Sequence, residues 1–247
     1  MKRFLIALTF LTRIPLPFNT AFDQEDFRKA QPFYPLVGLI IGLGLLLLWK
    51  ITSLIFPPLI VAAFLIAGEI FLTGGIHLDG FMDSMDGLLS GRNREKTLEI
   101  MKDSRIGSYA AVHLLTLLIL KFAFFATLDP QVMPFILILY PALSRWALLA
   151  AILYFPYIRS EGLGKGLHEN ATHLFFIIEG LVLVIAAFFL LHWTGPLLCL
   201  SALLTSWLMG QRVTKILGGL TGDIYGAIIE ICQLIILIFA YIGHRIF

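Results

Sequence analysis

The sequence predicts an all-α, polytopic integral membrane helix bundle with about seven transmembrane helices. Hydrophobic residues fill 59% of the 247 positions and charged residues 14%, and the mean hydropathy is +0.91. Soluble domains carry roughly 25% charged residues. So few charges cannot cover a water-facing surface, and the apolar residues gather in runs that approach the length of a membrane span, about 20 residues. Most of the outer surface is therefore expected to face lipid.

Seven apolar runs follow one another along the chain as the expected spans. They are 33–56, 59–73, 106–128, 132–157, 174–194, 197–210 and 224–243. The second and sixth are short, which predicts tilted, broken or re-entrant segments. The N-terminus begins like a signal peptide, but Arg13 interrupts its apolar stretch and no small-residue cleavage site follows. We interpret it as an interfacial or re-entrant helix that stays in the mature protein.

The connectors between the runs differ in charge, and this sets the expected orientation. Fourteen of the 18 Lys and Arg residues lie in segments 1–32 and 74–105 and in the loops after the fourth and sixth runs, whereas the other three connectors contain none. By the positive-inside rule, the basic segments are cytoplasmic. We expect one domain, residues 1–247, in the cytoplasmic (inner) membrane, with a cytosol-facing active site centred on 73–107 and 218–230.

Other features of the composition exclude further classes. The formal net charge is only +2, which gives no reason to expect a nucleic-acid partner. The two cysteines, Cys199 and Cys232, lie in apolar runs and are expected to be small buried hydrophobes, not a disulfide or a metal site.

Several ionisable residues fall inside the expected spans. Glu69, Arg145 and Glu230 are expected either to pair with one another structurally or to act in catalysis, since intramembrane charges are costly. Lys121 is expected to extend its ammonium group toward the membrane surface.

The segment 77–87, HLDGFMDSMDG, holds the densest acidic chemistry. Its aspartates, Asp79, Asp83 and Asp86, are spaced i, i+4 and i+7. At about 100° per residue, Asp83 lies about 40° and Asp86 about −20° from Asp79 around a helix. Three carboxylates on one face repel one another unless a cation binds them, and Mg²⁺ prefers such oxygen ligands. The alternative is a solvated acidic face or a helix N-terminus that favours acids.

Residues beside this segment are candidates for substrate contacts. Gly74 and Gly75 either let the backbone approach a ligand closely or only end the preceding helix. His77 is a candidate metal ligand, general base or hydrogen-bond donor. Segment 101–107, MKDSRIG, brings an acid, basic groups and the Ser104 hydroxyl to the entrance of a span. In it Lys102 and Arg105 either clamp diphosphate oxygens or anchor the span at the membrane surface.

A second polar cluster, GGLTGD, occupies 218–223. Asp223 either completes a metal shell opposite the aspartate triplet or caps an interfacial helix. Together the two clusters point to metal-assisted chemistry at a diphosphate.

The DxxxDxxD spacing partly matches two membrane enzyme classes that use diphosphate substrates with Mg²⁺. These are the prenyltransferases and the CDP-alcohol phosphotransferases, and neither motif is complete here. A third alternative is a transporter with broken helices around an acidic ion site. The acids lie at the cytosolic ends of spans instead of at mid-depth, which disfavours transport.

Taken together, these segments resemble the cobalamin synthase family, the adenosylcobinamide-GDP ribazoletransferases. The matching stretches are FLTRIPLP at 10–17, FYPLVG at 33–38, TGGIHLDG at 73–80, MKDSRIG at 101–107 and GGLTGD at 218–223, together with Asp83, Asp86 and Gly87. They cover almost the whole chain. Where the family often has Leu-Ala-Asp-Thr, this chain has FMDS at 81–84, which keeps the aspartate.

The resemblance implies a particular Mg²⁺-dependent reaction. A hydroxyl of α-ribazole, or of its 5′-phosphate, would attack the phosphorus nearer cobinamide in adenosylcobinamide-GDP, GMP would leave, and adenosylcobalamin or its 5′-phosphate would form. This is the step that assembles the nucleotide loop of cobalamin. A homo-oligomer and other enzymes of nucleotide-loop assembly are further candidate partners, besides the lipid bilayer.

The resemblance also implies roles for individual residues. Asp79, Asp83 and Asp86 would hold Mg²⁺, with Asp103 and Asp223 as further ligands. Phosphate-binding roles would fall to Lys102 and Arg105, with Arg13 as an additional candidate. One of the aspartates or His77 would take the proton of the attacking hydroxyl.

Overall fold

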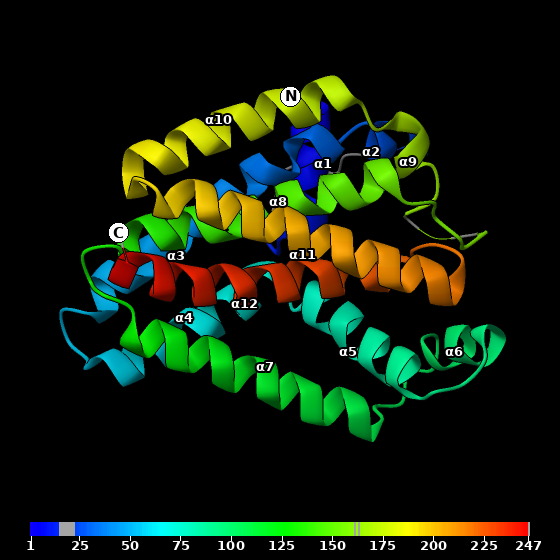
Figure 1. Cartoon of the computed structure of the whole chain (residues 1–247), viewed down its shortest axis with the longest axis horizontal. Helices are drawn as coiled ribbons and strands as arrows, with labels where there is room; N and C mark the ends of the chain where they lie inside the picture. Colours follow the sequence, from blue (N-terminus) through cyan, green and yellow to red (C-terminus); the bar gives the residue numbers. More distant parts are fainter. Residues whose placement is uncertain (15–22, 161, 163, 247) are drawn as a thin grey trace.

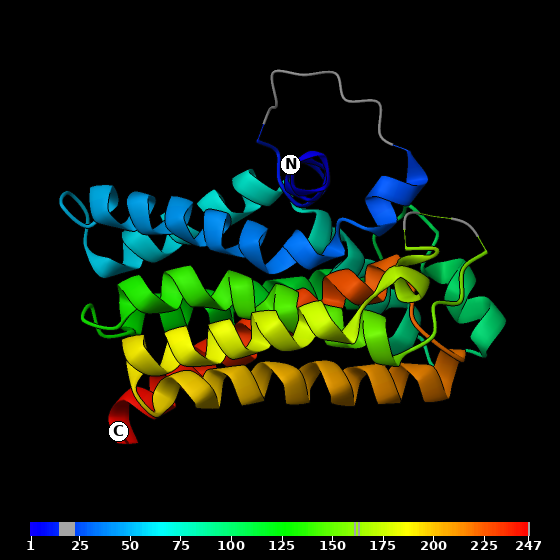
Figure 2. The same ribbon diagram turned by 90° about the horizontal axis from the view of Figure 1, so that it is seen from above.

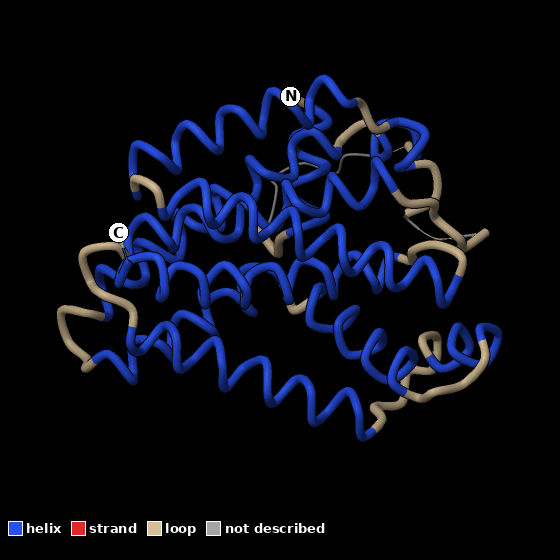
Figure 3. The backbone as a smooth tube through the Cα atoms, in the orientation of Figure 1, coloured by secondary structure: helices blue, strands red, loops and turns tan. Residues whose placement is uncertain are grey.

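The computed structural model describes residues 1–14, 23–160, 162 and 164–246, and Figure 3 shows that these residues are almost entirely helical. The helices are α1 (Lys2–Leu11), α2 (Gln24–Arg28), the short 3₁₀ helix η1 (Gln31–Phe33), α3 (Tyr34–Thr52), α4 (Pro58–Thr73), α5 (Ile76–Leu89), α6 (Arg94–Ile100), α7 (Ser108–Thr127), α8 (Met133–Tyr154), α9 (Leu167–Asn170), α10 (His173–Leu191), α11 (Thr194–Leu217) and α12 (Gly222–Ile246). One isolated bridge joins Tyr157 to Leu220. The all-α prediction is confirmed. The last part of the FLTRIPLP stretch, residues 15–17, lies outside the described residues.

The long helices lie side by side along one axis (Figures 1 and 2). Among the described residues, five stretches are long and apolar enough to cross a membrane: 31–52 and the helices α7, α8, α10 and α12. The bent pair α4 and α5 makes a sixth if it counts as one span. Our expectation was about seven. The difference is α11, whose 24 residues pack along α10 and α12 but include glycine, proline, serine and threonine among the leucines.

The two short runs of the sequence have different outcomes. The second is broken, because α4 ends at Thr73 and the chain turns by 94° into α5. The sixth is not broken, because it lies within one continuous helix, α11. Its helix continues to Leu217 because Arg212 and Lys215, which end the apolar run, are also good helix formers.

The N-terminal helix lies across the bundle. Figure 2 shows α1 end-on while the long helices run across the view, and α1 packs on α2 and α3. This orientation agrees with the expected interfacial helix.

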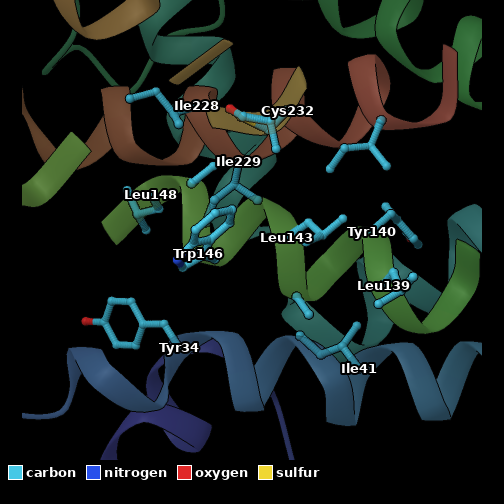
Figure 4. Close-up of a cluster of buried hydrophobic side chains, with 14 of the residues drawn as sticks. Tyr34, Ile41, Leu139, Tyr140, Leu143, Trp146, Leu148, Ile228, Ile229 and Cys232 are labelled. Atoms are coloured by element: carbon cyan, nitrogen blue, oxygen red, sulfur yellow. The ribbon is translucent and has the colours of Figure 1, made fainter. Parts of the chain in front are cut away.

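The centre of the bundle is α8, which is buried along nearly its whole length (Figure 4). It packs against α3, α10, α11 and α12. A Cβ at Gly38 would lie 2.5 Å from the carbonyl oxygen of Pro141, and one at Gly42 would lie 2.6 Å from that of Leu137. The small residues therefore let the α3 and α8 backbones touch, as is common between membrane helices. Large apolar side chains on the outer faces, such as Leu47 and Leu181, are exposed and suit contact with lipid.

The connectors gather at two ends of the bundle. The short turns 53–57 and 128–132, together with the C-terminus, lie at one end (Figure 1). The segments around α6 and α9 and the turn 218–221 lie at the other, which is the basic end predicted from the sequence.

A buried ionic cluster connects three helices within the apolar core. The sequence predicts that Lys121 on α7 extends toward the membrane surface, but the side chain is buried. Its Nζ lies 2.9 Å from Glu69 on α4, 3.0 Å from Glu230 on α12 and 2.9 Å from the side-chain oxygen of Gln233. The fully buried Arg145 on α8 donates to the carbonyl oxygen of Pro141. Glu69 and Glu230 thus serve as structural partners, and both pair with Lys121.

Candidate active site

The break between α4 and α5 begins the site. Gly74 and Gly75 both adopt left-handed backbone angles, with φ of 68° and 72°. The Arg13 side chain crosses directly over Gly74, where a Cβ would collide with it, and the Arg13 amide donates to the carbonyl oxygen of Leu72 at 2.7 Å. The expected helix end at Gly74 is confirmed, and the close approach there is made by Arg13.

Helix α5 is held against the start of α12 by two glycines. A Cβ at Gly80 would lie 2.9 Å from the Asp223 backbone, and one at Gly226 would lie 2.9 Å from the carbonyl oxygen of His77. The absence of side chains lets the two helices meet closely. As a result, aspartates more than 130 positions apart in the sequence come together.

Three carboxylates form the acidic cluster: Asp79, Asp83 and Asp223. Asp223 and Asp79 act electrostatically on Asp83, and Asp79 acts on Asp223. Arg159 donates to Asp223 at 2.5 Å and so offsets part of the negative charge. Asp79 is exposed and Asp83 half-buried, and among the described residues neither accepts a hydrogen bond. The guanidinium group of Arg159 therefore offsets only part of the negative charge of the three carboxylates.

Asp86 has a different environment although it shares their helix. Its carboxylate accepts hydrogen bonds from the backbone amides of Gly107, at 2.7 Å, and Ala110, at 2.9 Å. These amides belong to the N-terminus of α7, which favours negative charge. Asp86 therefore caps a membrane helix.

The MKDSRIG segment borders the acidic cluster at Met101, whose carbonyl oxygen lies 3.5 Å from the Arg159 Nη2 that also binds Asp223. Arg105 binds Asp103 through Nε at 3.0 Å and Nη2 at 2.5 Å, and this contact lowers the pKa of the Asp103 carboxyl to about 2. Lys102, Ser104 and Arg105 are exposed. Neither these three residues nor Asp103 lines any of the cavities described below. In the described part of the chain, no three His, Cys, Asp or Glu side chains converge closely enough to hold a metal as they stand.

His77 points into the core. Its Nε2 lies 3.3 Å from Nη2 of Arg145. A guanidinium can only donate, so this nitrogen accepts and the ring proton lies on Nδ1. The contact opposes the proposed role of His77 as a hydrogen-bond donor at Nε2.

Two cavities meet at Asp79. We call the first, of about 250 Å³, the aromatic cavity; Tyr34, Tyr157 and Tyr225 line it together with Asp223 and Arg159. The second, of about 650 Å³, we call the open cavity; Arg13, Gly74 and Gly75 line it. A third hollow, of about 630 Å³, lies beside them over α1 and α2. Two substrates can therefore approach Asp79 from different sides.

Sequence reasoning missed some residues of the site. Arg159 is one of the basic loop residues that set the expected orientation, and the sequence gives it no role in the site. Tyr157 and Tyr225 belong to no quoted motif, and Tyr34 lies in the FYPLVG stretch at 33–38 without a predicted role. Tyr225 lies two positions after Asp223, a proximity that could have marked it. Arg159 and Tyr157 follow α8 in a loop whose position depends on the bridge to Leu220.

The described part of the chain is an all-helical bundle with helices able to span a membrane, and it carries an acidic centre in which Asp79 lines two cavities; this places it among integral membrane proteins with a polar site at one end of the bundle. Comparison with known proteins makes the class specific. The chain belongs to the cobalamin-5-phosphate synthase family, whose model matches residues 3–241.

Named relatives cover nearly the whole chain. One from Desulfitobacterium hafniense is 46% identical over 98% of this chain and 97% of its own. One from Acetivibrio thermocellus is 39% identical over 98% of each chain, and one from Carboxydothermus hydrogenoformans is 38% identical over 96% of this chain and 94% of its own. All three are named adenosylcobinamide-GDP ribazoletransferase. No solved structure matches the chain.

Proposed function

We propose that this protein joins adenosylcobinamide-GDP to α-ribazole, or to α-ribazole 5′-phosphate, and releases GMP. The full-length relationship to ribazoletransferases supports the substrates. The observation that carries the chemistry is the cluster of Asp79, Asp83 and Asp223, in which Asp79 lines both cavities and Asp223 lines the aromatic cavity. No feature of the site favours a CDP-alcohol, a prenyl diphosphate or a transported ion over this pair.

The proposed reaction breaks a phosphoanhydride bond and forms a phosphate ester. A ribose hydroxyl of α-ribazole attacks the phosphorus nearer cobinamide and forms a new P–O bond. The bridging P–O bond breaks, and its electron pair leaves with GMP. Asp79 and Asp83 are the candidate acceptors for the hydroxyl proton, because they lack hydrogen-bond partners within the described residues. His77 is disfavoured as the base, because its Nε2 faces Arg145.

The acidic cluster suits Mg²⁺. Three carboxylates face one another with one guanidinium to offset them, and such a set repels itself without a further cation. Mg²⁺, when bound, would neutralise diphosphate charge and stabilise the leaving oxygen. Asp79, Asp83 and Asp223 would hold it after side-chain rotation. Asp86 and Asp103 are weaker candidates, since α7 amides and Arg105 already bind them.

Two arginines are placed to bind the diphosphate. Arg13 lines the open cavity with Asp79, and it has no carboxylate partner among the described residues. Arg159 lines the aromatic cavity beside Asp223. Guanidinium groups bind phosphate oxygens through paired hydrogen bonds. Lys102 and Arg105 line neither of these two cavities, so they would act on the diphosphate at longer range.

The orientation follows from the charge distribution. The acidic cluster lies at the basic end of the bundle, so we place it on the cytosolic side of the cytoplasmic membrane. A cysteine introduced at the exposed Glu95 should react with an impermeant maleimide only in permeabilised cells. Reaction in intact cells would reverse the orientation.

The direct test is an assay with purified protein in liposomes. The protein receives adenosylcobinamide-GDP, α-ribazole and Mg²⁺, and GMP and the corrinoid product are followed. We expect GMP release that requires both substrates and stops on chelation of the metal. Folded protein that releases no GMP would refute the proposed function, and release that persists under chelation would refute the metal dependence alone.

A further inference from the structure

The lining of the aromatic cavity combines a charged group and an apolar group of residues. Asp79, Asp223 and Arg159 form the charged group. In the apolar group aromatic rings cluster: Phe10 lies 4.8 Å from Phe27 and 6.3 Å from Tyr34 between ring centroids. Aliphatic side chains complete this group: Leu11, Leu148, Ile152, Leu167 and Ile229. The cavity therefore suits a ligand that combines an apolar ring with hydroxyl or phosphate groups.

Two phenol hydroxyls in the wall lack partners. Tyr34 is 1% exposed and Tyr225 is 6% exposed. In the part of the chain that the structure describes, neither hydroxyl makes a hydrogen bond. A buried polar group without a partner costs about 1–3 kcal/mol, so such groups commonly mark a ligand contact. Tyr157, whose ring centroid lies 6.0 Å from that of Tyr225, extends the same wall.

The size and polarity of the cavity distinguish the ligands of the proposed reaction. At about 250 Å³ it suits a nucleoside and is much too small for a corrin ring. Guanine presents donors and acceptors along two edges, which an apolar wall with two hydroxyls cannot satisfy. The dimethylbenzimidazole ring of α-ribazole is apolar apart from one free ring nitrogen, which accepts a single hydrogen bond. A phenol hydroxyl is a suitable donor to it.

The charged group of residues lies where the reaction requires it. With the benzimidazole between the aromatic side chains, the ribose points toward Asp79 and Asp223. The open cavity, on the other side of Asp79, is larger and contains Arg13, which suits the diphosphate of the second substrate. The two cavities thus separate acceptor from donor.

We propose that the aromatic cavity is the acceptor subsite, in which Tyr34 and Tyr225 select the benzimidazole ring of α-ribazole. This assignment rests on the proposed function. It adds specificity-determining residues to which the motifs assign no role, although Tyr34 lies in the FYPLVG stretch, and it excludes the guanosine from this cavity.

The test measures binding and kinetics in the full-length protein. Equilibrium dialysis with α-ribazole alone, in detergent, gives its Kd without turnover. We expect Tyr34→Phe and Tyr225→Phe each to raise this Kd about three- to tenfold, the equivalent of one hydrogen bond. The KM for α-ribazole should rise equally and the KM for adenosylcobinamide-GDP should stay unchanged.

A matched control and a filling variant sharpen the test. Tyr140→Phe removes another fully buried phenol hydroxyl, which lies near Glu69 and does not line the cavity, so the Kd for α-ribazole should stay within about twofold. Gly222 lines the cavity, and a Cβ there meets no atom within 4 Å. Gly222→Val should therefore fold and weaken α-ribazole binding more than tenfold, about 1.4 kcal/mol or more.

Each outcome separates this inference from the proposed function. Phenylalanine variants that raise the KM for adenosylcobinamide-GDP and leave α-ribazole binding intact would assign the cavity to guanosine and overturn the inference. Unchanged constants for both substrates would also overturn it. Wild-type protein that binds α-ribazole through these tyrosines but releases no GMP would refute the proposed function and leave the subsite standing.

Discussion

Asp79, Asp83 and Asp86 lie within one narrow stripe of α5, yet their partners differ. Asp86 accepts two amide hydrogen bonds from α7, whereas Asp83 faces Asp79 and Asp223 across the contact between α5 and α12. Carboxylates one turn apart on the same face of a helix can therefore contact different neighbouring helices. Identical side chains at i, i+4 and i+7 thus differ in their surroundings: Asp86 caps a helix, whereas Asp79 and Asp83 accept no hydrogen bond among the described residues.

Because their surroundings differ, replacing Asp83 or Asp86 by asparagine should have opposite effects on turnover and on stability. Asp83→Asn should lower turnover more than about 100-fold, because it removes charge at the reaction centre. It should not reduce the melting temperature, because it also removes like-charge repulsion. GMP release and thermal unfolding in the same detergent measure both quantities.

Asp86→Asn is the control for that experiment. It weakens the cap on α7, so stability should fall by about 1 kcal/mol while most turnover remains. Near wild-type turnover in Asp83→Asn would remove Asp83 from the catalytic site.

At the scale of the elements, the break between α4 and α5 decides where the aspartates lie. Two successive left-handed glycines turn the chain by 94° and direct α5 along α12. A continuous helix would carry Asp79 and Asp83 away from Asp223. The break also gives Arg13 its place across Gly74.

Substitution of these two glycines separates backbone strain from the Arg13 contact. Gly75→Ala should cost about 1–2 kcal/mol in stability, because φ is 72°, yet a Cβ there meets no atom within 4 Å. Gly74→Ala carries the same strain and also displaces Arg13. We expect only Gly74→Ala to raise the KM for adenosylcobinamide-GDP. Equal KM values for both variants would show that Arg13 does not bind that substrate.

At the scale of the whole molecule, the ionic cluster around Lys121 ties α4, α7 and α12 together inside the apolar core. Glu69 and Glu230 share one ammonium group, and Arg145 adds a second buried positive charge nearby. Arg145 also contacts His77 on α5, so the cluster reaches the helix that carries the aspartates.

Lys121→Met should destabilise the bundle by about 3–5 kcal/mol, because it leaves two buried carboxylates without their partner. Thermal unfolding in detergent measures the loss. The double variant that adds Glu230→Gln should recover most of it, because Glu69 then remains as the one buried carboxylate beside the one buried cation, Arg145. Failure of the double variant to recover would mean that the ionic cluster is needed for more than charge balance.

Much of the fold was predictable from the sequence because lipid imposes simple rules. Apolar runs, basic loops and the all-helical class follow from composition and spacing, and the motif at 77–87 located α5 and its acids. The different surroundings of Asp86 and of Asp79 and Asp83 were not predictable, because they depend on where the α7 N-terminus and Asp223 lie. Neither was Arg159, whose loop is positioned by the Leu220 bridge. The partners of Lys121 likewise depend on the packing of three helices.

The sequence by itself determined that most of the surface faces lipid, that the fold is helical, which end of the bundle is charged and which aspartates lie there. These features follow from hydropathy and helical periodicity, which are local properties of the chain. Only the tertiary structure decided which carboxylates face one another, which one caps a helix, and that three tyrosines from separate segments line one cavity beside them. Those relations join residues far apart in the chain, and close packing at Gly80 and Gly226 sets their distances. Local patterns carry no information about such contacts.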